Sequence, residues 1–232
     1  NSTFGEKMKK LSSQPVFISK RKIPAAIFSL FVLVFCLKSV TYAGDKIGNG
    51  GGLWACTADK VLRKGMLVDL YEASEELGLS IIAPTSKDPM VLVGELADFL
   101  RENLSELSEK LEPHYASVMG SIRYVNANLT IVDDALFRIS PLPLSCPGGT
   151  WEYLQFANFT ILNSVLIRKD LWESNVVPAL DKSALIWHEV IYRWLRVEFK
   201  DTNSVRARQL VGLLYSQLPV KEISFQMEQV IE

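Results

Sequence analysis

The sequence predicts an α+β protein in which an antiparallel β-meander packs against several α-helices, after an N-terminal signal peptide. Three features of the 232-residue chain support this prediction. An uncharged apolar run lies near the start, apolar residues at helical spacing occupy both ends of the remainder, and segments rich in β-branched and aromatic residues lie between them. No internal repeat or linker divides residues 44–232, so we expect one exported domain there.

Residues 1–43 have the features of a secretory signal peptide. Residues 8–22 hold five basic side chains and no acidic one, residues 23–37 form an uncharged apolar run, and the segment that follows ends on the small residue Ala43, where we expect cleavage. A membrane-spanning helix needs about 20 apolar residues, and the run at 23–37 is shorter than that. We therefore expect the run to be a cleaved signal and expect no stable membrane insertion after cleavage. Met8 is a natural initiation point, and we expect the seven residues before it to be no part of the signal.

The charge of the chain is balanced overall but unevenly distributed. Of 25 basic and 26 acidic residues, seven basic residues but only Glu6 among the acids precede Gly44. The remaining residues therefore carry a net charge of about −7. Proteins that bind nucleic acid need basic surface to displace counterions from phosphates, so we expect no nucleic-acid partner.

Two cysteines, Cys56 and Cys146, remain after the predicted cleavage. A lone pair of thiols in an oxidising compartment is most simply interpreted as one disulfide, which agrees with a periplasmic or secreted protein. Two alternatives stay open at this point, namely two thiolate ligands of a metal ion and two free thiols. The metal alternative lacks CxxC spacing and needs further ligands.

The first part of the exported region begins with glycines and continues with two predicted helices. The glycine-rich stretch 48–52 predicts a flexible terminus, which a surface adhesin or effector would expose, and a short strand is expected at 53–56. Apolar residues at helical spacing predict a helix at 65–77. Asp88 is a helix cap followed by proline, and the apolar stripe after it predicts one long amphipathic helix that ends at Pro113.

Three middle segments have the composition of strands and form the predicted meander, at 124–132, 151–158 and 164–168. The C-terminal part is predicted to be helical. A short helix begins at Asp170, and a helix at 181–200 is apolar on most sides, which is typical of a buried helix. A last amphipathic helix covers 205–218, and the tail at 220–232 is only weakly helical.

One motif on the predicted buried helix suggests chemistry. His188 and Glu189 begin a pattern that matches the HExxH zinc-peptidase motif except that Tyr192 stands where the second histidine would be. Residues four apart share a helical face, so His188 and Tyr192 face one point, where His188 would be a metal ligand. Glu189 would be the general base, Tyr192 is the other catalytic candidate, and a third ligand would come from an acid such as Asp69 or Glu72.

Two other interpretations of the same motif need no metal. Glu189 and Arg193 are four residues apart in the favourable order and are expected to pair along the helix, while His188 would be a hydrogen-bonded core histidine and Tyr192 would offer it a hydroxyl. Alternatively, His188, Glu189, Tyr192 and Arg193 would be the polar anchors of a pocket for a small ligand or peptide.

The chain resembles a family of uncharacterised exported proteins of Gram-negative bacteria that share a Cys pair and a helix of ALIxHExxYR type. The residues that carry the resemblance are GNGG at 48–51 closely followed by Cys56, LVDLYEA at 67–73, Cys146 after a proline-bearing stretch, RKDLW at 168–172 and ALIWHEVIYR at 184–193. The resemblance implies export and pairing of Cys56 with Cys146, and it implies no catalytic role.

The main hypothesis from the sequence is an exported bacterial envelope protein, periplasmic or secreted, that acts by binding or structure and needs no cofactor. The alternative is a divergent zincin-like zinc hydrolase that uses His188 and Glu189, in which zinc is the cofactor.

Overall fold

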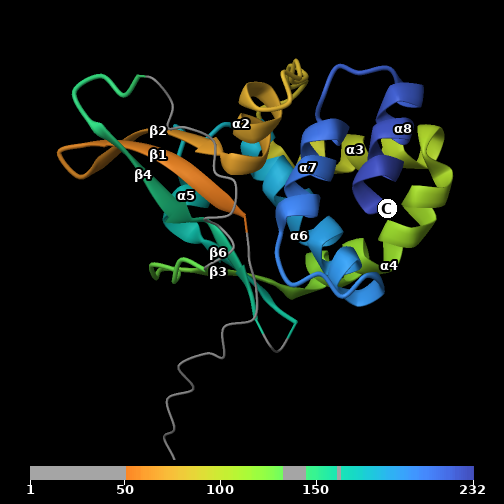
Figure 1. Ribbon diagram of the computed structural model, residues 1–232. Coiled ribbons are helices and arrows are strands. Elements are labelled where there is room, and N and C mark those ends of the chain that lie inside the picture. The colour runs from red at the N-terminus through yellow and green to blue at the C-terminus, as the bar shows by residue number, and fades with distance from the viewer. Residues whose placement is uncertain (1–50, 133–144, 161–162) are drawn as a thin grey trace, which may run out of the picture. The chain divides into compact units, whose positions relative to one another are not determined.

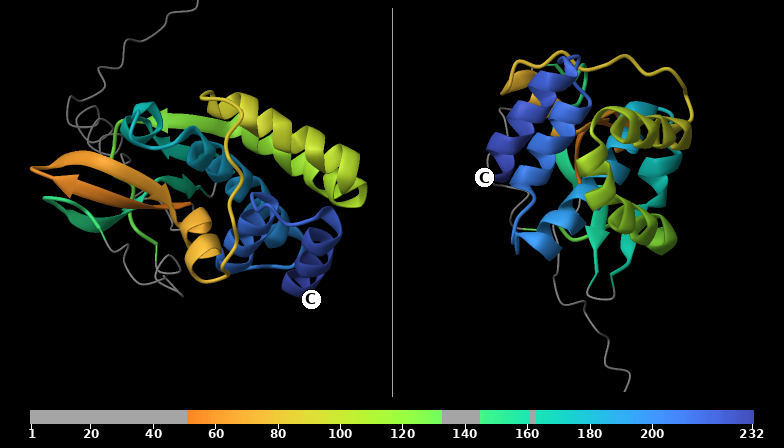
Figure 2. Two further views of the ribbon diagram at one scale, coloured as in Figure 1. Left: turned by 90° about the horizontal axis from the view of Figure 1, so that it is seen from above. Right: turned by 90° about the vertical axis from the view of Figure 1, so that its right-hand side faces the viewer.

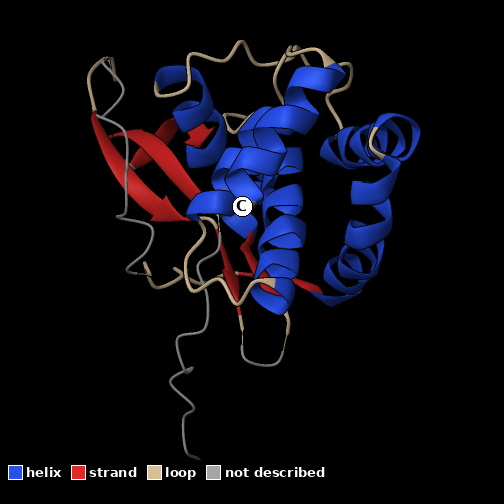
Figure 3. Cartoon of the chain, turned by 45° about the vertical axis from the view of Figure 1, so that its right-hand side comes forward, coloured by secondary structure: helices blue, strands red, loops and turns tan. Residues whose placement is uncertain are grey.

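The structure is a computed structural model that describes residues 51–132, 145–160 and 163–232 (Figure 1). The chain separates into two units, Asn1–Ala43 and Gly44–Glu232, and all described residues belong to the second. The predicted signal peptide therefore lies outside the described residues. Figure 1 shows the strands at one side and most helices at the other, and Figure 3 shows that helices make up most of the described chain. The predicted α+β class is confirmed.

The first sheet contains three antiparallel strands in the order β2-β1-β4. They are β1 (Gly52–Ala58), β2 (Val61–Leu67) and β4 (Thr150–Gln155). β1 and β2 form a hairpin whose two turn residues, Asp59 and Lys60, both have positive φ, the geometry that matches the twist of a two-residue hairpin. β2 replaces the start of the helix predicted at 65–77, because the helix α2 (Val68–Glu75) begins only after Leu67.

The second sheet has the strand order β3-β6-β5 and contains one parallel pair. Its strands are β3 (Ile122–Val125), β5 (Ala157–Phe159) and β6 (Val165–Arg168), of which β3 and β6 are parallel and β5 and β6 antiparallel. The predicted middle segments are therefore divided between two sheets. The segment predicted as one strand at 151–158 changes sheet at Phe156, whose N–H donates to the carbonyl of Gly51 at 3.0 Å.

The long predicted helix is two helices, α3 (Pro89–Asn103) and α4 (Ser105–Ser121), separated at Leu104. The predicted cap is present, since Asp88 Oδ1 accepts a hydrogen bond from the Met90 N–H at 2.8 Å. The predicted end at Pro113 is wrong, because α4 continues through this proline to Ser121. Leu111 and Val118, on either side of Pro113, are buried, and this packing offsets the hydrogen bond that proline removes.

The C-terminal part consists of α5 (Lys169–Glu173), α6 (Ala179–Glu198), α7 (Val205–Leu214) and α8 (Val220–Ile231). The predicted burial of α6 is confirmed, since its buried positions run without a break from Leu180 to Tyr192. α6 packs against α3, α4 and α7, and Figure 2 shows α3 and α4 lying along it. α8 is a full helix and not the weakly helical tail that the sequence predicted, because Ile223 and Met227 bury one face of it.

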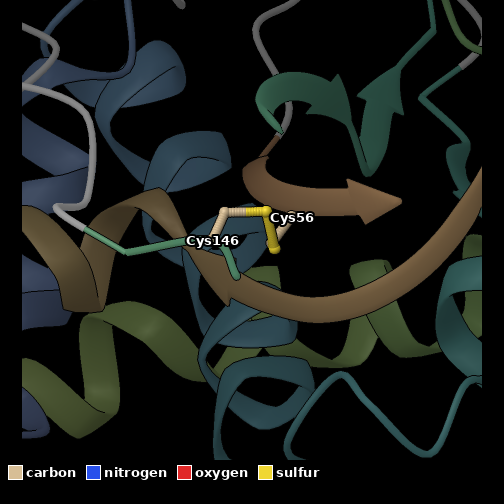
Figure 4. The surroundings of a disulfide bond; sticks show 2 residues. All are labelled: Cys56 and Cys146. Carbon is tan, nitrogen blue, oxygen red and sulfur yellow. A yellow bond between two sulfur atoms is a disulfide. The ribbon is translucent and has the colours of Figure 1, made fainter. Parts of the chain in front are cut away.

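A disulfide joins the first sheet to the chain segment that precedes β4 (Figure 4). Cys56 lies in β1, Cys146 lies just before β4, and their Cα atoms are 5.5 Å apart. The predicted pairing is confirmed, and the alternatives of thiolate ligands and free thiols are thereby excluded for this structure. Within the described residues, no helix has both the length and the apolar character needed to cross a membrane.

Candidate functional site

The candidate site lies in the middle of α6, where helices surround His188 and Glu189. Neither side chain has exposed surface. α6 contacts α2, α3, α4, α7 and β2, and its apolar side chains are buried in these contacts. The two polar side chains on the same helix therefore also lie in the interior. Buried polar groups in native proteins usually have hydrogen-bond partners. The partners of His188 and Glu189 lie in segments more than 100 residues earlier in the chain.

His188 is bonded to Asp69 of α2. The distance from His188 Nδ1 to Asp69 Oδ2 is 2.6 Å, and neither residue has exposed surface. An ionised carboxylate only accepts hydrogen bonds, so Nδ1 carries the proton and donates it. Nε2 of the same ring has no hydrogen-bond partner among the described residues.

The electrostatic surroundings favour the charged form of His188. Burial lowers the pKa of His188, because it removes water from the imidazolium, but the charge and the hydrogen bond of Asp69 outweigh this effect. Glu189 raises the pKa further and Arg208 lowers it. The pKa of His188 therefore lies above the ordinary value of 6.5, which favours the protonated ring beside Asp69.

Glu189 holds the backbone at Gly51, the residue directly before β1. Its Oε1 accepts a hydrogen bond from the Gly51 N–H at 3.1 Å. Burial raises the pKa of Glu189 to about 7, although the charge of His188 and the Gly51 N–H lower it. The ion pair predicted between Glu189 and Arg193 is not formed, since Glu189 Oε2 and Arg193 Nε both lack a hydrogen-bond partner among the described residues.

Gly51 and Gly52 do not belong to an exposed flexible terminus. Both are buried, and Gly52 is the first residue of β1. A Cβ atom on Gly51 would lie 2.2 Å from Cδ1 of Leu185, which has no exposed surface. The glycine thus lets the backbone approach α6 closely enough to reach Glu189. Residues 48–50 lie outside the described residues.

Tyr192 lies beside His188, but Arg193 does not. Tyr192 is buried, and the centroids of its ring and the His188 ring are 6.1 Å apart. Arg193 is only half-buried and its guanidinium lies 5.6 Å from the centroid of the Phe159 ring. Of the four residues predicted to line one pocket, three are therefore buried in the core, whereas Arg193, one turn after Glu189, lies nearer the surface against Phe159.

Further charged groups lie in the same interior. Asp181, predicted as the cap of α6, lies inside the first turn, and its Oδ1 accepts the Leu67 N–H at 2.5 Å. Arg208 Nε donates to Glu72 Oε2 at 2.8 Å, and Arg208 also bonds Ser204. Burial raises the pKa of Asp181 and of Glu72 to about 7 each, although Arg208 lowers the second.

The sequence pattern identified part of this cluster. Helical spacing places His188 and Glu189 on a buried helix. Asp69 and Glu72 are the acids that the sequence suggests as possible third ligands beside His188. The sequence pattern does not single out Arg208, a basic residue of α7 that the structure buries. The feature that points to Arg208 is its position on an apolar helix face, because a buried basic side chain requires a buried acid.

The donors present do not fit a protein-bound zinc ion. A catalytic zinc site needs three protein ligands. In the part of the chain that the structure describes, no three His, Cys, Asp or Glu side chains are grouped so that they could hold a metal ion. Asp69, one predicted third ligand, bonds the His188 ring itself, and Glu72, the other, bonds Arg208.

The buried hydrogen bonds of His188 and Glu189 connect α6 to Asp69 of α2 and to Gly51 at the start of the first sheet. Comparison with known proteins gives no family assignment, since no family model, no curated protein and no solved structure matches this chain.

Proposed function

We propose that this chain is an exported protein of the bacterial envelope, periplasmic or secreted, that acts by binding or structure and not by catalysis. The observation that carries the proposal is the complete enclosure of His188 and Glu189, together with their bonds to Asp69 and Gly51. A catalytic acid or base must come within hydrogen-bond reach of its substrate. Both groups are instead used to hold α6 to α2 and to the start of β1.

The compartment is supported by the disulfide and by the resemblance. Disulfides persist in oxidising compartments and are rare in the cytosol. The Cys56–Cys146 bond agrees with export, as does the signal-like composition of residues 1–43. The resemblance to exported proteins of Gram-negative bacteria supports the same destination.

The test of export is expression of the full chain in a Gram-negative host, followed by separation of periplasm and cytoplasm. We expect the recovered protein to have the mass of a chain that begins at Gly44, with Cys56 and Cys146 both resistant to alkylation until a reductant is added. A Cys56→Ser variant is the control, since it leaves Cys146 free to react. Cytoplasmic protein that retains the leader, and in which Cys56 and Cys146 react as readily as Cys36 of the leader, would contradict the proposal.

A second function, a divergent zincin-like zinc hydrolase, is favoured by one observation. Asp69 holds Nδ1 of His188 while Nε2 has no partner among the described residues, which is how a carboxylate orients a histidine that ligates zinc. In that function His188 would be one ligand and Glu189 the base, although the described residues do not group the three ligands that a catalytic zinc ion needs. Metal analysis of the purified protein decides between the two: stoichiometric zinc that is lost in His188→Ala supports the hydrolase, and zinc-free protein whose Tm is unchanged by added zinc excludes it.

A further inference from the structure

Two arginines of α6 lie against the same aromatic ring. The guanidinium groups of Arg193 and Arg196 are 5.6 Å and 5.1 Å from the centroid of the Phe159 ring in β5. Arg196 also lies 5.7 Å from the centroid of the Tyr192 ring. Contact with aromatic faces restrains the planar guanidinium groups, so their N–H edges are held in place on a rigid helix.

Arg193 and Arg196 have no acidic partner among the described residues, as is also true of Arg63 and Arg123. Four other arginines in the described residues form ion pairs with carboxylates, namely Arg101, Arg168, Arg206 and Arg208. No ion pair of the described residues includes Arg193 or Arg196, and Nε of Arg193 and Nη1 of Arg196 are buried without an acceptor. These two N–H groups are enclosed, and the other guanidinium N–H groups of both residues form no hydrogen bond or ion pair with the described residues, so those groups have unused capacity to bind an anion from solvent.

The charges around the pair do not supply that anion. Glu189 is close enough to influence Arg196, but its one assigned hydrogen bond is to a backbone N–H. On α4, burial lowers the pKa of His114 and the charge of Arg193 lowers it further, whereas Glu198, an exposed acid of α6, raises it. Burial lowers the pKa of Arg193, and the neighbouring charge of Arg196 lowers it further. The two cations therefore repel each other and are not neutralised by a bonded acid.

The pair is reachable from solvent. Both arginines are only half-buried, and the adjacent Val197 is 46% exposed. Arginine forks bind carboxylate and phosphate oxygens through paired hydrogen bonds. Two cations are neutralised by one dianion, and a phosphate monoester carries a charge of about −1.5 to −2 at neutral pH, whereas a single carboxylate carries only one negative charge.

We propose that Arg193 and Arg196, backed by Phe159, form a binding site for a phosphate group, either free phosphate or the monoester of a small molecule. This site adds a chemical class of ligand to the proposed binding function. It rests on that proposed function only for the compartment in which the protein encounters the ligand.

The experiment titrates inorganic phosphate, glycerol phosphate and acetate, at constant ionic strength, into the purified oxidised protein and measures binding by calorimetry. We expect saturable binding of phosphate or of the monoester, and the tighter of the two identifies the source. We expect Arg193→Gln and Arg196→Gln each to weaken it about tenfold or more, the loss for one charge-assisted hydrogen bond. Arg123→Gln, which changes an exposed arginine of β3, is the matched control and should bind like the unmodified protein.

Three results would overturn the site: no saturable binding of either phosphate compound, acetate binding as tight as phosphate binding, or an equal loss in Arg123→Gln. Arg196→Lys keeps the charge but loses the fork, so it serves if a glutamine variant fails to fold, and full affinity in that variant counts against the site. The mass and thiol measurements test export separately, so failure of phosphate binding leaves the proposed compartment intact.

Discussion

Glu189, Glu72 and Asp181 are carboxyl groups whose burial sets their protonation. Each has a pKa of about 7 in the folded protein, because the interior disfavours the charged form. His188 is the opposite case, since the charge of Asp69 outweighs burial and raises its pKa. All four groups therefore hold their protons more tightly in the folded chain than in the unfolded chain.

The first prediction follows from this difference in proton binding. The three carboxyl groups have ordinary pKa values of 4.5 or 3.8, so the folded state binds more protons between that range and about pH 7. Their contribution to stability is fully present below the ordinary pKa and is lost as pH rises through about 7. His188 adds a loss in the same direction as pH rises through its raised pKa. We expect Tm to fall between about pH 5 and about pH 8, measured by circular dichroism.

Glu189→Gln is the control for this pH dependence. The amide keeps an oxygen for the Gly51 N–H and removes the ionisation, so the fall in Tm should be shallower in the variant. For Glu189 the loss of stability is on the order of 3 kcal/mol at full ionisation. A Tm that rises over the same pH range would show that the buried acids do not bind protons as described.

A second prediction concerns the His188–Asp69 pair. His188→Ala leaves the Asp69 carboxylate buried without its partner, and breaking a buried ion pair in this way costs about 3 to 5 kcal/mol. We expect the double variant with Asp69→Ala to lose less free energy of unfolding than the two single variants together, by about 1 to 3 kcal/mol. Urea unfolding of the four proteins measures this coupling, and additive losses would mean that the pair is not bonded.

At the scale of elements, α7 approaches α2 closely, and this contact places the buried charges. A Cβ atom on Gly212 of α7 would lie 2.6 Å from Cβ of Ala73 in α2. One turn earlier on α7, Arg208 reaches Glu72 of α2, and Asp69 of the same helix reaches α6. Any change that separates α2 from α7 therefore also disturbs the charged cluster.

The third prediction is that Gly212→Ala destabilises the protein by about 1 to 3 kcal/mol, because the added methyl group overpacks the contact with Ala73. Gly94→Ala in α3 is a matched control. A Cβ atom there meets nothing within 4 Å, so the change should stabilise by about 0.5 to 1 kcal/mol through helix propensity. Chemical denaturation measures both. Equal effects of the two substitutions would show that α2 and α7 are not in close contact.

The sequence predicts helices and strands correctly where an apolar periodicity extends over many residues. It fails where a single turn decides where an element begins or ends. The buried helix α6 and the capped start of α3 were predicted, since each has a long apolar stripe or a cap. The β1–β2 hairpin was not, because its turn residues Asp59 and Lys60 lack the usual glycine. The break at Leu104 and the continuation through Pro113 depend on packing against α6, which local sequence does not encode.

The candidate site was only half predictable for the same reason. His188 and Glu189 are adjacent in sequence, so their helix and burial follow from spacing. Their partners, Asp69 and Gly51, are 119 and 138 residues away. A single sequence offers no measure of such contacts, and the glycine stretch was therefore interpreted as a flexible terminus when part of it is packed against the core.

At the scale of the whole molecule, the disulfide joins chain segments 90 residues apart. In the chain-entropy account, a cross-link over a loop of this length stabilises the folded state by about 4 to 5 kcal/mol, because it restricts the unfolded chain. Since native domains are stable by only about 5 to 15 kcal/mol, the bond supplies a large part of the stability.

The fourth prediction is that the double variant Cys56→Ser and Cys146→Ser unfolds at much lower denaturant concentration than the oxidised protein, with a loss of about 4 to 5 kcal/mol. The reduced unmodified protein is the control and should match the variant. A variant as stable as the oxidised protein would mean that the fold does not depend on an oxidising compartment.

The central claim is that the His188–Glu189 motif is an enclosed structural feature. Its most direct test is an NMR pH titration, which is simple to assign because the chain has only two histidines, His114 and His188. We expect His188 to titrate above 6.5 with its Nδ1 proton protected from exchange with water, and His114, whose pKa burial lowers, to titrate below 6.5. A His188 ring that titrates at or below 6.5 and exchanges its Nδ1 proton rapidly would contradict the account.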